Sequence, residues 1–226
     1  VSGTPGVGKS TFIDFLGAYL IKKGNRIAVL TIDPSSSISK GSILGDKTRM
    51  EKLSKSDLAF IRSSPSLGAL GGISNTTRDS ILICEAAGFN IIIIETLGVG
   101  QSEILVESIT DFFIYLTLIE NGDGLQFIKK GALELSDIIL INKCEKNIKE
   151  AEQVKYLMQK NIANFEYNKR SQTVFICSAL TGLNIENIWS YITTLYNNQK
   201  KSGKVKKKRE KQDLFWLKKM LEDELK

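Results

Sequence analysis

The chain begins with VSGTPGVGKST, residues 1–11, and this stretch decides the fold class. Residues 3–10 fit the pattern G-x-x-x-x-G-K-[ST] in full. Glycines at this spacing allow a tight loop whose N–H groups point inward at a β-phosphate. Lys9 would face the β- and γ-phosphate oxygens, and Ser10 would offer its hydroxyl to Mg²⁺. The pattern predicts a phosphate-binding loop made of Gly3, Thr4, Pro5, Gly6, Val7, Gly8, Lys9, Ser10 and Thr11.

Apolar runs rich in β-branched residues alternate with amphipathic stretches along the rest of the chain. Continuous apolar runs are typical of parallel strands that are covered on both faces. We therefore expect an α/β fold, a doubly wound and mostly parallel sheet of the P-loop NTPase type. We expect strands at Arg26–Ile32, Leu58–Arg62, Asn90–Glu95, Phe112–Ile119, Ile138–Asn142 and Thr173–Cys177. We expect helices at Lys9–Lys23, Thr77–Ala87, Gly124–Leu135, Ile148–Lys160 and Ile185–Tyr196.

The composition changes near residue 200. Residues 200–211 carry eight Lys or Arg side chains and one Glu, so the net charge of +6 is a property of this tail and residues 1–199 are neutral overall. We expect a nucleotide-binding domain at 1–199, followed at 200–226 by a basic linker and a C-terminal helical arm. A phosphate loop ordinarily follows a buried strand, and only Val1 and Ser2 precede it here. We therefore expect a central N-terminal strand upstream that this sequence does not include.

Several classes of chemistry are excluded by composition. Histidine is absent, which excludes Ser-His-Asp and Cys-His catalysis and any His-ligated metal site. Three cysteines that are far apart fit reduced thiols, and so a cytoplasmic location, better than a disulfide framework. The longest apolar runs, Ile91–Ile94 and Phe112–Ile119, fall well short of the ~18 residues that would suggest a membrane span. We expect no membrane association.

Two carboxylates stand at the ends of expected strands. Asp33 ends the run AVLTID, and Glu95 follows four isoleucines that we expect to be buried. In α/β sheets, ligands bind outside the carboxyl ends of the strands. An acid next to buried isoleucines is costly unless a cation or hydrogen bonds compensate it, and Mg²⁺ would do so. The alternative is a solvated strand terminus.

A candidate base-reading motif, Asn142-Lys143-Cys144-Glu145, follows the strand expected at Ile138–Asn142. It resembles N-K-x-D, in which the acid accepts two hydrogen bonds from guanine N–H groups, the Lys stem covers the base and the Asn braces the loop. Adenine presents the wrong edge to such an acid. Here the acid is Glu145, one methylene longer than Asp. A second base-contacting loop is predicted at Ser178, Ala179 and Leu180.

These segments together resemble the MeaB/ArgK/MMAA family, the GTPases associated with methylmalonyl-CoA mutase. The resemblance rests on residues 3–14, 32–50, 66–72, 95–103 and 122–131, together with NKCE and SAL. It implies a cytoplasmic GTPase with GTP or GDP and Mg²⁺ as cofactors, which gates adenosylcobalamin loading and protection of a cobalamin-dependent acyl-CoA mutase. It also implies a homodimer, a partner-sensing loop at Asn121–Gly131, and helices before the first strand that this sequence does not include. The Mg²⁺ ligands would be Ser10, Asp33, Asp46 and Glu95. The nucleotide would be held by Gly3 to Thr11, Asn142, Lys143, Glu145 and Ser178 to Leu180. The catalytic residues would be Lys9, Asp33, Glu95 and Gln101, and we expect hydrolysis to be slow without a partner.

The C-terminal stretch has a basic first part and an apolar second part. Leucines at 214, 217, 221 and 225 repeat at helical spacing, and Phe215, Trp216 and Met220 widen the stripe. This stripe would pack on its own domain or on another subunit, and the resemblance favours a dimerisation arm. No aromatic residue interleaves the lysines, so nucleic-acid binding is not expected.

Other functions stay open. The chain could be a metal-insertion GTPase for a nickel enzyme, against which the lack of histidine and paired cysteines argues, or a regulatory nucleotide-binding module with little hydrolysis. A nucleic-acid-binding protein with a basic tail is an alternative from another class, and a transport-associated kinase is a weaker one.

Overall fold

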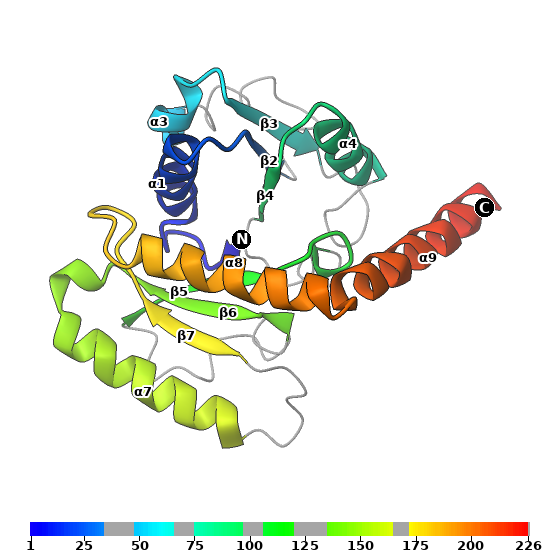
Figure 1. The fold of residues 1–226 in the computed structure, drawn as a ribbon. Helices are drawn as coiled ribbons and strands as arrows, with labels where there is room; N and C mark the ends of the chain where they lie inside the picture. The colour runs from blue at the N-terminus through cyan, green and yellow to red at the C-terminus, as the bar shows by residue number, and fades with distance from the viewer. Residues whose placement is uncertain (34–47, 66–74, 97–105, 120–134, 165–171, 226) are drawn as a thin grey trace.

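The computed structural model describes residues 1–226 except 34–47, 66–74, 97–105, 120–134, 165–171 and 226 (Figure 1). The strands are β1 (Ser2–Gly3), β2 (Ile27–Asp33), β3 (Ala59–Pro65), β4 (Ile91–Glu95), β5 (Ile114–Leu118), β6 (Ile138–Asn142) and β7 (Thr173–Ile176). The helices are α1 (Lys9–Lys22), α3 (Glu51–Ser54), α4 (Asn75–Ala86), α7 (Ile148–Asn164), α8 (Ile185–Lys201) and α9 (Lys204–Glu224), with a 3₁₀ turn, η3, at Cys144–Lys146.

Every strand pair in the described residues is parallel. Two hydrogen-bonded groups are present, in the orders β3-β2-β4 and β1-β5-β6-β7. Residue 1 links them, because the Val1 amino group donates to Ile94 O at 2.6 Å and Thr96 N donates to Val1 O at 3.1 Å. The resulting order, β3-β2-β4-β1-β5-β6-β7, places β1 and the loop that follows it in the middle of the molecule.

Helices cover both faces of the strands, which confirms the doubly wound α/β fold. Successive strand residues point to opposite faces, and the buried side chains accordingly divide into two cores. One core joins Val29 and Leu140 to α1, α3 and α8, through residues such as Phe12, Leu53 and Ile188. The other joins the alternate strand positions to α4, α7 and α9. Figure 1 shows α7 and α8 on opposite sides of β5, β6 and β7.

Apart from the short elements α3 and η3, which were not predicted, the described elements lie where the sequence predicts them, with differences at their ends. β6 has the predicted bounds, and β3 extends three residues past its predicted end. α8 is longer than predicted, because its polar C-terminal residues 197–201 continue the helix without apolar periodicity. α7 also extends past its predicted end, to Asn164, and its last turn carries the buried Ile162. α8 ends only before Gly203, whose φ of 72° favours glycine, so residue 199 lies inside a helix. The helix predicted at Gly124–Leu135 lies outside the described residues except for Leu135.

The isoleucine run of β4 is less buried than its sequence predicts. Ile93 and Ile94 are buried, but Ile91 and Ile92 are only half-buried. They border a cavity of about 620 Å³ that is also lined by α4, α8 and residues 209–213 of α9. The expectation of four buried isoleucines is therefore wrong for the first two.

The first half of α9 is fastened to the body by hydrogen bonds to residues 106–111. Arg209 donates to both Asp111 carboxylate oxygens, at 2.9 and 2.6 Å. Gln212 donates to Glu107 O and Thr110 O, each at 2.9 Å. Trp216 is 1% exposed and donates to Ser108 O at 3.2 Å. The tail thus packs on its own domain through this face.

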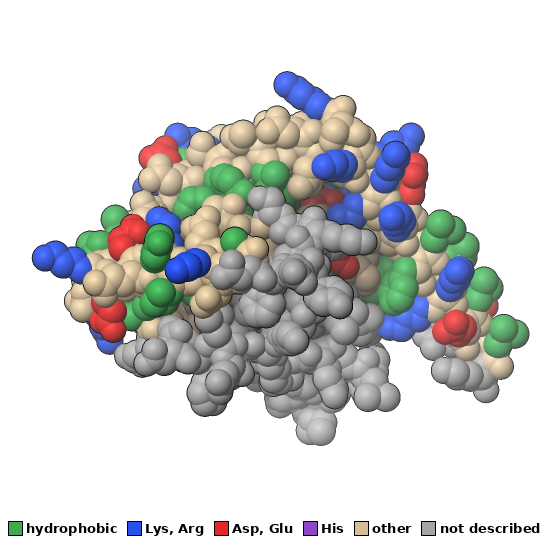
Figure 2. All heavy atoms as spheres, turned by 90° about the horizontal axis from the view of Figure 1, so that it is seen from below, with side chains coloured by type: hydrophobic (Ala, Val, Ile, Leu, Met, Phe, Trp, Pro, Cys, Tyr) green, Lys and Arg blue, Asp and Glu red, His purple; other side chains and the backbone are tan. Residues whose placement is uncertain are grey.

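The other face of α9 exposes its apolar side chains. Leu214, Leu217 and Leu221 are each more than half exposed, and Figure 2 shows hydrophobic side chains along the outer part of this helix. Figure 2 also shows Lys and Arg side chains gathered where α8 passes into α9. No helix in the described parts of the chain is both long and apolar enough to cross a membrane.

Candidate functional site

The phosphate loop connects β1 to α1 at the carboxyl end of the sheet. Gly8 stands just before α1 with φ of 94°, a conformation that favours glycine. A Cβ at this position would also lie 2.7 Å from Asn142 Nδ2, so both the turn and the close approach require glycine. Val7 is fully buried in the core and anchors the loop to it. The loop is therefore shaped by packing as well as by its glycines.

Lys9 points into this loop. Its Nζ donates to Gly3 O at 2.7 Å and to Thr4 O at 3.2 Å, and the residue is only 9% exposed. Burial lowers the pKa of Lys9, and the negative charge of Glu95 partly opposes that shift. A poorly hydrated ammonium group enclosed by a loop is well suited to an anionic ligand.

Ser10 and Glu95 bring the first turn of α1 to the end of β4. Ser10 Oγ donates to Glu95 Oε1 at 2.8 Å. Asp33 ends β2, which runs parallel to β4 with Thr31 opposite Glu95, so its backbone lies at the same sheet edge. The Asp33 side chain is not among those described, and Asp46 and Gln101 lie outside the described residues. Thr11 is exposed on α1. A hydroxyl and a carboxylate are oxygen donors of the kind that Mg²⁺ accepts.

Asn142 joins three loops. Its side-chain Nδ2 donates to Val7 O in the phosphate loop at 2.9 Å, while its Oδ1 accepts from Ala179 N at 2.9 Å. The Cys177 thiol donates to the same Oδ1 at 3.6 Å. Burial raises the pKa of Cys177, which keeps its proton in place for this bond. The predicted phosphate loop and both predicted base-reading loops are thus adjacent.

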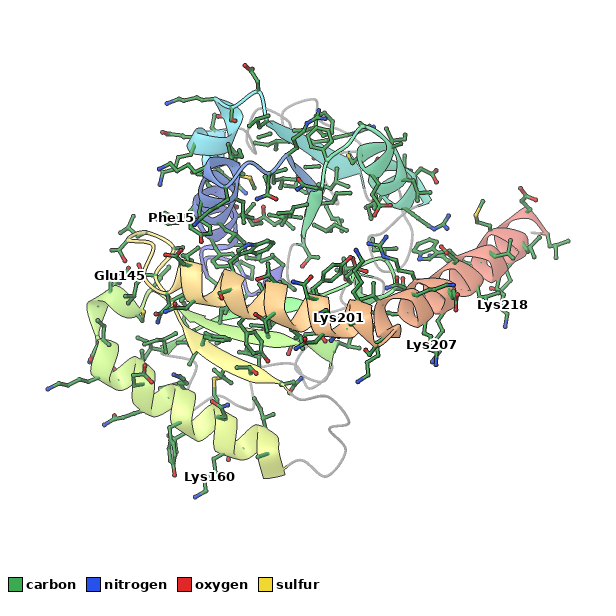
Figure 3. The ribbon with its side chains drawn as sticks, in the orientation of Figure 1. Phe15, Glu145, Lys160, Lys201, Lys207 and Lys218 are labelled. Carbon is green, nitrogen blue, oxygen red and sulfur yellow. The ribbon has the colours of Figure 1, made fainter. Side chains whose placement is uncertain are left out.

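Lys143 and Glu145 occupy the predicted base-reading motif. Lys143 has a left-handed backbone conformation, with φ of 62°. Its Nζ donates to Gly6 O at 2.8 Å, so its side chain extends to the phosphate loop. Glu145 lies in η3 and is partly buried (Figure 3). Its Oε2 is buried and has no hydrogen-bond partner among the described residues. A buried carboxylate oxygen without a donor is costly, so this atom is suited to a ligand that supplies an N–H group.

The second loop forms a compact turn after β7. Ser178 and Ala179 are buried, whereas Leu180 is 72% exposed. Gly182 N donates to Ser178 O at 2.8 Å, and Thr181 N donates to Ser178 Oγ at 3.1 Å. These bonds hold the turn in one shape beside Asn142.

Three contributors to the site were not predicted. Cys177 had no signal beyond its place at a strand end. Asp14 accepts from Leu53 N at 2.9 Å and from Lys52 N at 3.3 Å, which fastens α3 to α1. The signal in the sequence that could have found Asp14 is a lone acidic residue among the apolar residues of a helix. Phe15 contacts the second loop, and an aromatic residue on a helix gives no hint of such a role.

Known proteins match the chain along its length. The sequence profile of the family described as "Methylmalonyl Co-A mutase-associated GTPase MeaB" matches residues 1–226. GTPase ArgK of Escherichia coli (strain K12) is 44% identical over 229 residues, which cover all of this chain and 69% of that protein. The mitochondrial methylmalonic aciduria type A homolog of Mus musculus is 40% identical over 220 residues, which cover 96% of this chain and 53% of that protein.

Solved structures with the same fold are more distant in sequence. HypB from Helicobacter pylori, solved in complex with nickel, has a TM-score of 0.57 at 16% identity and covers 88% of this chain and 86% of its own. HypB from Archaeoglobus fulgidus has a TM-score of 0.55, also at 16% identity. These similarities show the shared α/β fold alone. The full-length match of the profile, together with the similarity to GTPase ArgK, shows that the chain belongs to the MeaB family of methylmalonyl-CoA mutase-associated GTPases.

Proposed function

We propose that this chain binds GTP with Mg²⁺, hydrolyses it slowly to GDP and phosphate, and uses that cycle to gate adenosylcobalamin loading and protection of a cobalamin-dependent acyl-CoA mutase. The observation that carries the nucleotide part is the buried Oε2 of Glu145, in the predicted base-reading motif, which has no hydrogen-bond partner among the described residues. The client is proposed from the family, whose description names methylmalonyl-CoA mutase.

Guanine supplies the N–H donors that Glu145 Oε2 lacks among the described residues. Its ring N–H and exocyclic NH₂ are adjacent donors, and a carboxylate can accept from both. Adenine presents an acceptor at the ring position, which would leave Glu145 Oε2 unpaired and add repulsion. The longer reach of Glu145 is compatible with this role, because one oxygen of this partly buried side chain is itself buried and has no hydrogen-bond partner among the described residues. We therefore expect GTP to bind more tightly than ATP.

The phosphates and the metal ion would occupy the other side of the site. The loop N–H groups, the Lys9 ammonium and the N-terminus of α1 would hold the β- and γ-phosphates. Ser10 and Glu95 would hold Mg²⁺, with Asp33 and Asp46 as further proposed ligands. When bound, Mg²⁺ supplies positive charge against the phosphate oxygens. Lys9 adds to that charge, and Gln101 is a candidate for orienting the attacking water.

The arm provides the proposed assembly surface. Residues 1–199 would form the GTPase domain and residues 200–226 a basic linker and dimerisation arm. The exposed leucines of α9 lie opposite the face that Trp216 fastens to the body, so a second copy could cover them without unfolding the first. We propose a cytoplasmic homodimer that does not use nucleic acid or membranes.

Two experiments test the proposal in separate steps. Competition between GTP and ATP for a fluorescent GDP analogue tests the nucleotide, and equal affinities would contradict guanine recognition. Co-purification with methylmalonyl-CoA mutase in GTP and in GDP tests the client. A complex that does not depend on the nucleotide, or no complex, would contradict the gating role and leave a GTPase with a different client.

A further inference from the structure

Phe15 touches the second base-reading loop from outside the nucleotide site. It lies on α1, beside the loop that joins β7 to α8 (Figure 3). A Cβ built on Gly182 would stand 2.1 Å from Phe15 Cζ and 2.5 Å from Cε1, so the Gly182 backbone rests directly against the ring. Gly182 also has φ of +82°. Glycine is needed here both for the close approach and for the left-handed turn.

The other end of the turn that contacts Phe15 is hydrogen-bonded to Asn142, a residue of the predicted base-reading motif. Gly182 N donates to Ser178 O at 2.8 Å, and Ala179, which follows Ser178, donates its N–H to Asn142 Oδ1 at 2.9 Å. The five residues from Ser178 to Gly182 are closed by this short hydrogen bond, so we expect them to move as a unit. A displacement at Gly182 would therefore displace Ala179 relative to Asn142 and Glu145.

The ring itself is fixed by α3. The Lys52 ammonium lies 4.5 Å from the centroid of the Phe15 ring, a cation–π contact. The backbone of α3 is fastened beside it, because Leu53 N and Lys52 N both donate to the Asp14 carboxylate. Phe15 thus has a defined position that does not depend on the loop it supports.

We propose that Phe15 is a positioning residue for guanine recognition: its ring sets the place of the Ser178–Leu183 turn so that this turn and Glu145 contact the same base. The inference rests on the proposed GTP-binding function. Because the Phe15 ring contacts the turn at Gly182, its contribution should concern the base and not the phosphates.

The test compares GDP and ADP on the whole chain, each by competition against a fluorescent GDP analogue. Phe15→Ala should weaken GDP binding by about tenfold or more, the loss of one well-placed polar contact, and leave ADP binding unchanged. Phe15→Leu, which keeps most of the apolar volume, should show a smaller loss. Tyr19→Phe is the matched control: it removes only the hydroxyl that donates to Glu186 Oε1, one turn along the same helix, and should change neither affinity.

A double-mutant cycle tests the contact itself. Gly182→Ala should weaken GDP binding strongly in the wild-type background and less when Phe15 is already Ala, because the obstructing ring is gone. Equal losses in both backgrounds would contradict the contact. Equal weakening of GDP and ADP by Phe15→Ala would show a merely structural role and overturn the proposal. If the wild-type chain does not prefer GDP to ADP, the proposed function fails first and the inference fails with it.

Discussion

Ser10 and Glu95 are 85 positions apart in the chain, yet the Ser10 hydroxyl donates a hydrogen bond to Glu95 Oε1 at 2.8 Å. The contact exists because Val1, just before β1, is hydrogen-bonded to Ile94 and Thr96 at the end of β4, which brings the first turn of α1 to the carboxyl end of that strand. It places two oxygen ligands of the proposed Mg²⁺ site next to one another before any metal binds.

Glu95→Gln should weaken the Mg²⁺-dependent part of GTP binding. The amide keeps the shape of the side chain but removes the negative charge that would hold the ion. We expect the Mg²⁺ concentration for half-maximal GTP binding to rise by about tenfold or more. Thr194→Ala, which removes an exposed hydroxyl from α8, serves as a control and should leave that concentration unchanged.

Lys9→Ala should abolish measurable GTP binding. The variant removes the ammonium group that now lies against Gly3 O and Thr4 O and that would face the phosphates. A charged hydrogen bond to each of two phosphates predicts a loss of about two orders of magnitude or more. Isothermal titration measures it. Retained affinity would contradict the phosphate-loop assignment.

GTP binding should weaken at alkaline pH, and Lys9 should be the reason. Burial lowers the pKa of Lys9 in the free protein, whereas bound phosphate would stabilise the ammonium and raise that pKa. Binding would then take up a proton between the two pKa values, so affinity is full below the lowered pKa and falls as the pH rises through it. Lys9→Arg, which stays protonated throughout, should flatten the profile. If the GTP affinity of Lys9→Arg still falls with rising pH as steeply as in the wild type, a group other than Lys9 causes the pH dependence.

Glu145→Gln should erase most of the preference for guanine. The variant keeps the volume of the side chain but presents an NH₂ group where guanine also presents N–H donors. We expect GDP affinity to fall by about 10²-fold, from the loss of charged hydrogen bonds, with little change for ADP. Glu152→Gln on exposed α7 is the matched control and should change neither affinity. An unchanged GDP-to-ADP ratio in Glu145→Gln would show that the base is read by other groups.

Two faces of α9 should respond differently to mutation. Trp216→Ala removes a fully buried side chain and should lower the free energy of unfolding by about 3–5 kcal/mol, measured by denaturant titration. Leu221→Ser acts on an exposed position and should leave unfolding of the single chain nearly unchanged while shifting the molar mass in light scattering from dimer to monomer. A wild-type chain that is already monomeric at high concentration would contradict the dimerisation arm.

Local patterns in the sequence were sufficient for the fold class. The phosphate-loop spacing at residues 3–10 and the apolar runs of β2, β5 and β6 are local features, and both reflect backbone constraints that act over a few residues. They predicted a parallel α/β fold correctly. They did less well at helix ends, because α8 continues through the polar residues 197–201, which carry no periodic signal.

The tertiary structure alone decided which distant residues meet. Periodicity placed Asn142, Ala179 and Val7 at separate element ends, but only strand order made Asn142 a bridge between two loops. It also decided that Trp216 is buried on residues 106–111 while its leucine neighbours stay exposed, a choice that the helical stripe left open. The physical reason is the same in each case: burial and hydrogen bonding between residues far apart in sequence depend on the packing of whole strands and helices, which no local spacing encodes.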